Sequence, residues 1–173
     1  MVTISVYRVE CFRWISEKMD GFRAYWNGEK LLSRGGNELP CPKWFVDGLP
    51  LGTKLDGEIW MGRGTLDILK GILRSSLDNS KMWKNITFSV FDLVDFNLCY
   101  EDRMATLANL DLPSFACVVE MERCRENDHL QEVLQTIVSK NGEGLVLTKP
   151  NSLYVSTRTN SRLKVKVCVK YLG

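Results

Sequence analysis

The pattern of apolar and polar positions divides the chain into many short strands and a few helices. Between Phe12 and Ser33 it predicts a strand and then a hairpin, because AYW and KLLS lie on either side of Asn27-Gly28. Asn-Gly between two such runs is a strong hairpin signal. Further runs rich in β-branched or aromatic residues predict strands. These runs are residues 55–61, 86–94, 115–124, 144–148 and 162–171.

Apolar residues at helical spacing predict three helices. Thr65 can cap the first, in which leucines 66, 69, 73 and 77 share one face. The second is expected from Tyr100 to Leu110, and Asp128 can cap a third that ends near Lys140. Strands outnumber helices, and the first strands are joined by a tight hairpin. The pattern therefore predicts an α+β fold with antiparallel sheets.

Composition is that of one soluble domain. The chain has 173 residues, of which 45% are hydrophobic and 25% charged, so disorder, collagen and coiled coil are excluded. No uninterrupted apolar stretch approaches the roughly 18 residues of a membrane span, and the N-terminus does not resemble a signal peptide. We therefore expect an intracellular protein without a membrane anchor.

Charge and cysteine usage narrow the chemistry. A net charge of +2 does not by itself indicate a nucleic-acid-binding protein, so any affinity for phosphate must be local. The six cysteines form no CxxC pair, and His129 is the only histidine of the sequence. The usual zinc spacing is absent, and nucleophiles paired with histidine are disfavoured. Catalysis, if present, is expected to use lysine, carboxylates or a metal.

Lys18 is the strongest candidate nucleophile. It lies in SEKMDGFR, where strand alternation would place Ser16, Lys18 and Asp20 on one face. A bare KxDG sequence is more often a surface lysine beside a turn. Five further elements nevertheless follow in a fixed order: SRGGN at 33–37, DGE at 56–58, FDLV at 91–94, EGLVL at 143–147 and LKVK at 163–166.

This ordered set resembles the nucleotidyltransferase motifs of ATP-dependent DNA ligases, whose superfamily includes RNA ligases and mRNA capping enzymes. The resemblance is greatest to small, minimal ligases of bacterial type and covers the chain from about Trp14 to Lys166. It implies two antiparallel sheets flanked by helices, with a nucleotide groove between the sheets. It also implies that Lys18 attacks the α-phosphate of ATP, carries AMP, and passes it to a 5′-phosphate that a 3′-hydroxyl then seals.

The resemblance assigns further roles residue by residue. Glu58 would bind the ribose or a metal, and Phe91 would stack on adenine. Glu143 would hold Mg²⁺, for which Glu58 and Asp20 are the other candidate ligands, because this ion prefers carboxylate oxygens. Arg34 would contact the ribose or the 5′-phosphate at the nick. Taken alone, each residue also fits an ordinary structural or surface position.

LKVK is expected to present two cations to the phosphates. Alternation puts Lys164 and Lys166 on one face, and the family assigns both to the α-phosphate and its transition state. With Arg23 and a bound metal, they are the cations expected to favour the neutral amine of Lys18.

One departure concerns adenine recognition. In many larger ligases an acid two residues before the nucleophile reads the adenine amino group, but here that position is Ser16. The acid is Glu17, whose side chain should point away from Lys18 on a strand. We therefore expect Ser16 and the backbone near Glu17 to make any adenine contact.

The expected organisation is one adenylation domain over residues 1–173, acting as a monomer on nicked duplex DNA or RNA. Family members continue into an OB-fold domain, which is expected to be absent here or supplied by a partner. Self-adenylation should then be slow.

Arg103 is expected either to support the pocket or to form a helix salt bridge. Basic residues expected outside the pocket are candidates for DNA phosphates, namely Arg8, Arg13, Lys43, Arg63, Arg74, Arg158 and Arg162.

Two other functions stay open. RNA ligation or RNA capping would use the same chemistry at Lys18. A non-catalytic nucleotide-binding domain could keep the fold, although the intact motifs disfavour it.

Overall fold

The computed structural model describes residues 12–75 and 80–166. Strands within these ranges form a four-stranded sheet of order β7-β1-β8-β9 and a five-stranded sheet of order β3-β2-β4-β5-β6. The strands are β1 Trp14–Glu17, β2 Phe22–Trp26, β3 Leu31–Ser33, β4 Leu55–Trp60, β5 Thr87–Leu93, β6 Ala116–Val118, β7 Met121–Arg123, β8 Gly144–Thr148 and β9 Arg162–Lys166. The helices are α1 Lys43–Asp47, α2 Leu66–Arg74, α3 Tyr100–Ala108 and α4 Asn127–Ser139, with a 3-10 turn at Met82–Asn85. The predicted α+β class is confirmed.

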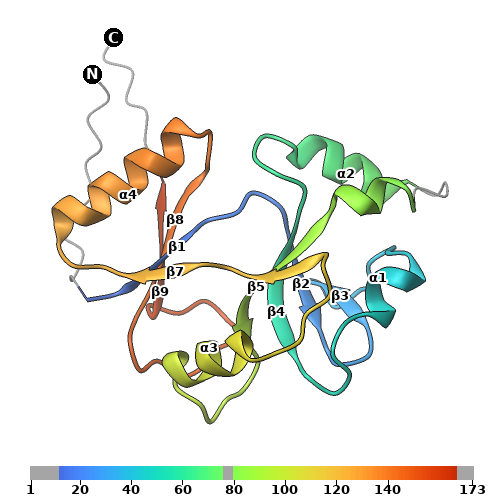
Figure 1. The fold of residues 1–173 in the computed structure, drawn as a ribbon, viewed down its shortest axis with the longest axis horizontal. Helices are drawn as coiled ribbons and strands as arrows, with labels where there is room; N and C mark the ends of the chain where they lie inside the picture. The colour runs from blue at the N-terminus through green and yellow to red at the C-terminus, as the bar shows by residue number, and fades with distance from the viewer. Residues whose placement is uncertain (1–11, 76–79, 167–173) are drawn as a thin grey trace.

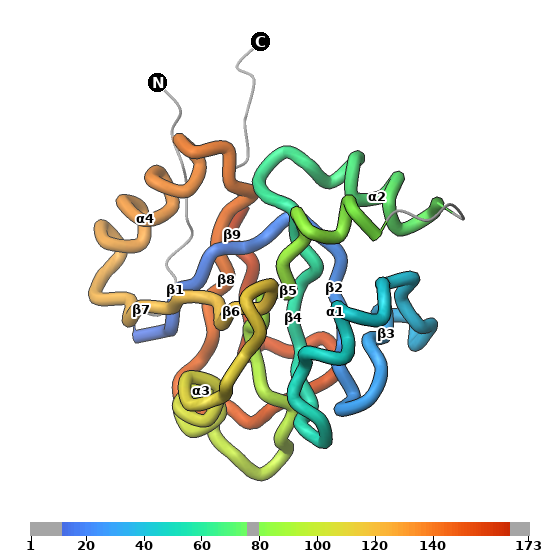
Figure 2. Tube along the Cα trace, turned by 45° about the vertical axis from the view of Figure 1, so that its right-hand side comes forward, coloured from blue at the N-terminus to red at the C-terminus, as the bar shows by residue number. Residues whose placement is uncertain are grey.

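Each sheet has its own apolar core. Helix α4 packs on the four-stranded sheet, where Leu130 and Leu134 meet Leu145 and Leu147. The other core is larger and includes several aromatic side chains, such as Phe45 of α1, which stacks on Phe115 with ring centroids 4.4 Å apart. Figures 1 and 2 show α4 beside one sheet and α1 and α2 beside the other. Neither core therefore fills the space between the two sheets.

The predicted hairpin is present. Strands β2 and β3 pair antiparallel, with Trp26 opposite Leu31. Gly28 has a φ of +98°, which glycine adopts without steric cost. The side chain of Asn27 accepts hydrogen bonds from the backbone N–H groups of Glu29 and Lys30, at 2.9 and 2.6 Å. The turn residues thus act as the sequence indicated.

The single strand predicted for residues 115–124 is wrong. The segment breaks at Val119 and Glu120 into β6, which pairs parallel with β5, and β7, which pairs antiparallel with β1. The chain therefore crosses from one sheet to the other, as the yellow segment across the centre of Figure 1 shows. The expectation of purely antiparallel sheets fails at this one pair, because alternation does not show which neighbour a strand joins.

Two predicted helix caps differ from the structure. Thr65 precedes α2, but its hydroxyl donates to the carbonyl of Gly62 at 2.7 Å and makes no cap bond. Asp128 lies inside the first turn of α4, whose N-cap is Glu126. The predicted positions of Leu77, Arg8 and the last strand beyond Lys166 fall outside the described residues.

Lys18 lies where the chain leaves one sheet for the other. Its backbone N–H donates to the carbonyl of Gly144 at 2.9 Å, just after the last residue of β1. Gly144 has a φ of +146°, and a Cβ there would lie 2.1 Å from the carbonyl oxygen of Val165. Only glycine fits this position, so the EGL element brings β8 and β9 against the candidate nucleophile.

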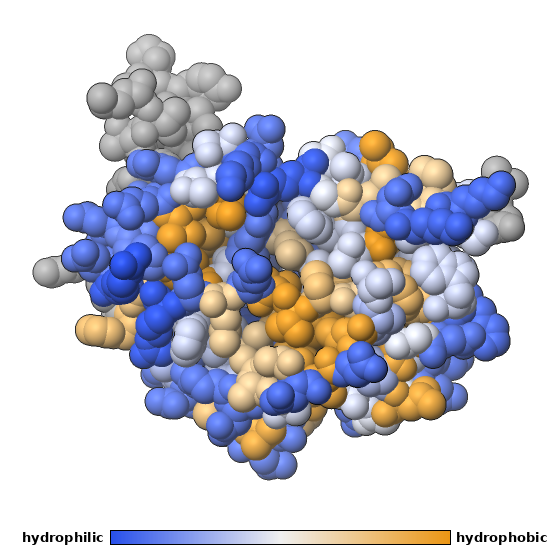
Figure 3. Space-filling model, viewed as in Figure 1, coloured by the Kyte–Doolittle hydropathy of each residue, from blue (hydrophilic) through white to orange (hydrophobic). Residues whose placement is uncertain are grey.

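The surface is mixed. Figure 3 shows apolar side chains in the middle of one face and hydrophilic ones around it. Among residues 12–75 and 80–166, no helix is both long enough and apolar enough to cross a membrane.

Candidate nucleotide-binding site

A cavity of about 490 Å³ lies between the two sheets. This volume is within the range of small-molecule sites. Eight of the residues expected at the site line it, contributed by β1, β2, β4, β5, β9 and nearby loops. They are Ser16, Glu17, Lys18, Arg23, Arg34, Glu58, Phe91 and Lys164.

Lys18 and Lys166 share one carboxylate. The Nζ atoms of both pair with Glu143, one at each carboxylate oxygen. Partial burial opposes ionisation of Glu143, but the hydrogen bonds from the two lysines outweigh it and hold its pKa below the usual value. The sequence led us to expect cations around Lys18. The structure instead pairs Lys18 with an acid, Glu143. The Lys18 amine must therefore leave Glu143 before it can attack a phosphate.

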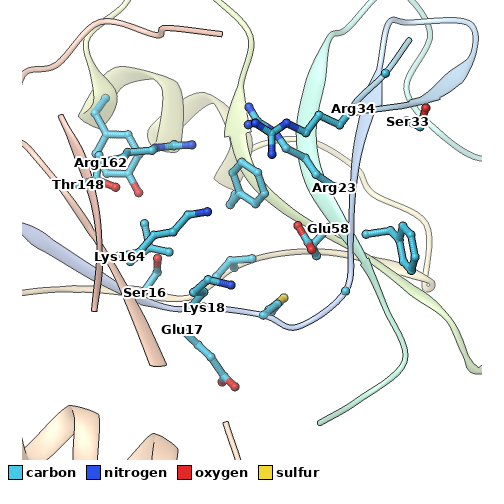
Figure 4. A pocket seen from close by; sticks show the side chains of 18 residues that line it. Ser16, Glu17, Lys18, Arg23, Ser33, Arg34, Glu58, Thr148, Arg162 and Lys164 are labelled. Atoms are coloured by element: carbon cyan, nitrogen blue, oxygen red, sulfur yellow. The ribbon is translucent and has the colours of Figure 1, made fainter. Parts of the chain in front are cut away.

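Strand β9 presents a row of three cations. Lys164 and Lys166 lie on one face, as predicted, and Arg162 precedes them at the same spacing. Lys164 lies opposite Val146, which in turn lies opposite Ser16, so these residues cross the sheet in register. Figure 4 shows the side chains of Lys164 and Lys18 at the same cavity, with Lys164 reaching into its open centre.

The side chain of Glu17 points out of the cavity, as expected for a strand neighbour of Lys18 (Figure 4). It forms a two-pronged ion pair with Arg63, with both N–O distances at 2.7 Å. Arg63 was expected to be a candidate for DNA phosphate, but its guanidinium is held by this carboxylate. The pair ties the end of β1 to the loop after β4.

Glu58 lines the cavity from β4. Burial raises the pKa of its carboxyl from 4.5 to about 7, although Lys18, the backbone N–H of Gly21 and Arg23 act in the opposite direction. Gly21 approaches β4 so closely that a Cβ would lie 2.2 Å from the carbonyl oxygen of Ile59. Near neutral pH, Glu58 can therefore either donate or accept a hydrogen bond, which suits contact with a ribose hydroxyl.

This shift predicts a pH-dependent stability. Between about pH 4.5 and 7 the folded state binds the Glu58 proton more tightly than the unfolded state. The free energy of unfolding should therefore fall as pH rises through that window, by at most about 3 kcal/mol. Urea unfolding at pH 5 and pH 8 should show this loss in the wild type and a smaller one in Glu58→Gln. An equal pH response in both proteins would contradict the assignment.

Phe91 is directed into the cavity by a β-bulge. Along the β4–β5 pair, Asp56 lies opposite Asp92 and Gly57 opposite Val90, so Phe91 has no opposite residue. A bulge of this kind re-aims a side chain. Phe91 is therefore only partly buried and lines the cavity, where it can offer a face to a base.

Two buried aspartates lie beside Phe91, and arginines neutralise both. Asp56 and Asp92 are each 1% exposed. Asp56 accepts from Arg23 at 2.9 and 2.6 Å, and this hydrogen bonding raises the pKa of Arg23. Asp92 accepts from Arg103 at 2.7 and 3.1 Å and from Arg162 at 2.6 Å. Arg103 thus supports the pocket from beneath, which settles the choice that the sequence left open.

The remaining expected residues lie around the edge. Arg34 lines the exposed rim of the cavity, and Figure 4 shows it next to Arg23. Glu143, Lys166 and Asp20 do not line the cavity. Glu143 and Lys166 adjoin it through Lys18, whereas Asp20 acts on Lys166 only through its charge, which helps to raise the pKa of that lysine.

The residues fit a magnesium ion that arrives with a nucleotide. Within the described part of the chain, no group of three or more His, Cys, Asp or Glu side chains is arranged to hold a metal. Mg²⁺ is usually held by only one or two carboxylates together with substrate phosphates and water. Glu143 is ionised, beside Lys18 and partly exposed, so it meets that requirement.

Sequence reasoning missed several residues of the cavity. Arg162 was placed outside it, yet it lines the wall, and Thr148 and Tyr100 line the same end. Arg13 was also expected to be free for DNA, but it is buried and donates to the carbonyl of Ser161 at 3.2 Å. The signal that identifies Arg162 is the alternation of RLKVK, which continues the face of the two lysines by one step.

Comparison with known proteins gives consistent matches. No family model matches the sequence. A DNA ligase of Haemophilus influenzae is 32% identical over 157 residues, which make up 88% of this chain and 58% of that protein. A solved Lig E DNA ligase superposes with a TM-score of 0.83 at 33% identity, covering 90% of this chain and 62% of the other.

Two more distant structures share the fold. The chlorella virus DNA ligase-adenylate has a TM-score of 0.73 at 21% identity, over 91% of this chain and 62% of that one. The ATP-dependent DNA ligase of bacteriophage T7, in complex with ATP, has a TM-score of 0.71 at 14% identity, over 91% and 62% of the two chains.

The chain spans a little under two thirds of the relatives that it matches at more than 30% identity. Over that part, the order of the motifs, the two-sheet fold and the position of Lys18 agree with one another. Both the sequence and the fold of this chain are similar to those of ATP-dependent DNA ligases, over the part of those proteins that it spans.

Proposed function

We propose that residues 1–173 form the adenylation domain of an ATP-dependent DNA ligase. One observation carries the proposal: Lys18 lies in a nucleotide-sized cavity that Lys164 also lines, and it is paired with Glu143. At this position Lys18 can separate from Glu143 when a nucleotide binds, and Lys164 and Lys166 can bind the phosphates. The similarity at 32% and 33% identity to two DNA ligases supports the same activity.

The first step is attack by the Lys18 amine on the α-phosphorus of ATP. An N–P bond forms, the bond between the α-phosphorus and the bridging oxygen to the β-phosphate breaks, pyrophosphate leaves, and the amine gives up its proton to solvent. The arriving phosphates compete with Glu143 for both lysines and so loosen the ion pair between Lys18 and Glu143. Lys164 and Lys166 then stabilise the negative charge that develops on the α-phosphate oxygens.

The second step takes place at the same phosphorus, and the third at the phosphorus of the nick. An oxygen of the 5′-phosphate at a nick attacks the AMP phosphorus, and the N–P bond breaks to return the lysine. A 3′-hydroxyl then attacks the 5′-phosphate, and AMP leaves with the bridging oxygen. Arg34, exposed at the edge of the cavity, is placed to hold the 5′-phosphate or the ribose.

Within the cavity the remaining residues bind the nucleoside. Phe91 stacks on adenine, and Glu58 holds the ribose. Ser16 and the backbone beside Glu17 make the adenine contact. Glu143 holds Mg²⁺, which neutralises phosphate charge when bound, and Asp20 is a weaker candidate for that role because it does not line the cavity.

The partners are proposals of the same kind. We propose nicked duplex DNA as the substrate and an OB-fold domain, in this protein or in a partner, as the clamp that holds it. We propose that the protein acts as a monomer. An intracellular location follows from a substrate of ATP and DNA.

Transfer to a nick tests the substrate class. The protein would be loaded with labelled AMP and given the same nicked duplex made of DNA or of RNA. We expect AMP to pass to the 5′-phosphate of the DNA nick at the higher rate, because both relatives above 30% identity are DNA ligases. Faster transfer to RNA would favour the RNA-ligase alternative, and transfer to neither would contradict ligation.

A further inference from the structure

Arg162 bridges the two sheets at one end of the cavity. It belongs to β9 of the four-stranded sheet, and its Nη2 donates to Asp92 on β5 of the other sheet at 2.6 Å. Asp92 is in turn gripped by Arg103, whose remaining Nη1 donates to the carbonyls of Leu98 and Ser152 at 2.7 and 2.9 Å. The guanidinium of Arg162 is therefore held in place by the buried pair of Asp92 and Arg103.

The same guanidinium lies beside the expected base platform. Its carbon is 5.2 Å from the centroid of the Phe91 ring and 5.9 Å from that of Tyr100. Figure 4 shows Arg162 next to Thr148, at the end of the cavity opposite Arg34. Planar guanidinium groups and aromatic rings are the two kinds of surface on which bases stack.

The position of Arg162 along β9 separates it from the phosphate-binding residues. Lys166 lies opposite Gly144, beside Glu143, and Arg162 lies opposite Thr148. Four residues of strand span about 13 Å, so Arg162 is at the far end of the row from Lys166. A nucleotide whose α-phosphate meets Lys18 would turn its base, and not its phosphates, toward that end.

We propose that Arg162 is a base-binding residue, whose fixed guanidinium completes with Phe91 the wall against which the purine of the nucleotide packs. This rests on the proposed function and adds a residue to the same site. The carboxylate of Asp92 compensates the charge of Arg162 and fixes its plane, so Arg162 contributes a surface more than a free cation. Arg103 acts through Asp92 as a positioning residue.

Equilibrium binding with two probes tests the role. A Lys18→Ala parent, which cannot form the covalent adduct, would carry Arg162→Met, Arg162→Lys or the control Lys149→Met, an exposed lysine outside the cavity. Dissociation constants would be measured for ATP and for inorganic tripolyphosphate, which has no base.

We expect Arg162→Met to weaken ATP binding about tenfold and tripolyphosphate binding less than twofold. Arg162→Lys should behave like Arg162→Met, because it keeps the charge but loses the plane. Lys149→Met should change neither constant. The variants should fold, since Asp92 keeps its two-pronged pair with Arg103.

Two results would overturn the inference. Equal weakening of both probes would make Arg162 a phosphate-binding cation, and unchanged ATP binding would make it purely structural. Failure of the parent to bind either probe, with no AMP adduct on the wild type, would instead sink the proposed function and this inference with it.

Discussion

Lys164→Met should slow formation of the AMP adduct by about 10²- to 10³-fold, the usual cost of removing one group that stabilises transition-state charge. Lys164 reaches into the cavity that Lys18 lines, whereas Lys166 is paired with Glu143. Of the two lysines, Lys164 therefore meets the α-phosphate without first breaking an ion pair with Glu143. Methionine has an unbranched side chain of similar length to lysine but carries no charge.

The rate of AMP incorporation from labelled ATP, at saturating ATP, measures this effect. Lys149→Met is the matched control, since it removes a lysine that does not line the cavity. The control should keep the wild-type rate. An unchanged rate in Lys164→Met would show that Lys164 has no part in the first step.

Arg103→Met should destabilise the fold by about 3 to 5 kcal/mol, the range for removing one partner of a buried ion pair. Both Arg103 and Asp92 have side chains that are only 1% exposed. The substitution leaves Asp92 with one partner, Arg162, and also removes the donor to the carbonyls of Leu98 and Ser152.

Urea unfolding followed by circular dichroism gives the free energy directly. Lys43→Met is the control, because the pair of Lys43 with Asp47 has side chains that are 84% and 53% exposed and should contribute little. A loss as small as that of the control would show that the aspartate–arginine network does not stabilise the fold.

Local sequence patterns predicted the elements well. Asn27-Gly28 produced the hairpin, and alternation in LKVK put Lys164 and Lys166 on one face. The outward direction of Glu17 followed from the same rule, because neighbours on a strand point to opposite faces. The ordered motifs also assigned Lys18 and Glu143 to one site, and the structure pairs these residues although they are 125 positions apart.

The rest depends on long-range pairing, which local patterns do not encode. Nothing in ITFSVFDLV marks the bulge that leaves Phe91 without an opposite residue. The break after Val118 arises because β6 and β7 pair with different sheets. Alternation in RLKVK could place Arg162 on the face of Lys164, but not its hydrogen bond to Asp92, a contact between residues 70 positions apart.

Intact-protein mass spectrometry after incubation with Mg²⁺ and either ATP or GTP is the most direct test of Lys18 as the nucleotide-carrying residue. We predict a gain of one AMP from ATP on the wild type, no gain in Lys18→Ala, and no adduct from GTP. An AMP adduct that persists in Lys18→Ala would contradict the assignment of the lysine, and a GMP adduct would point to RNA capping instead.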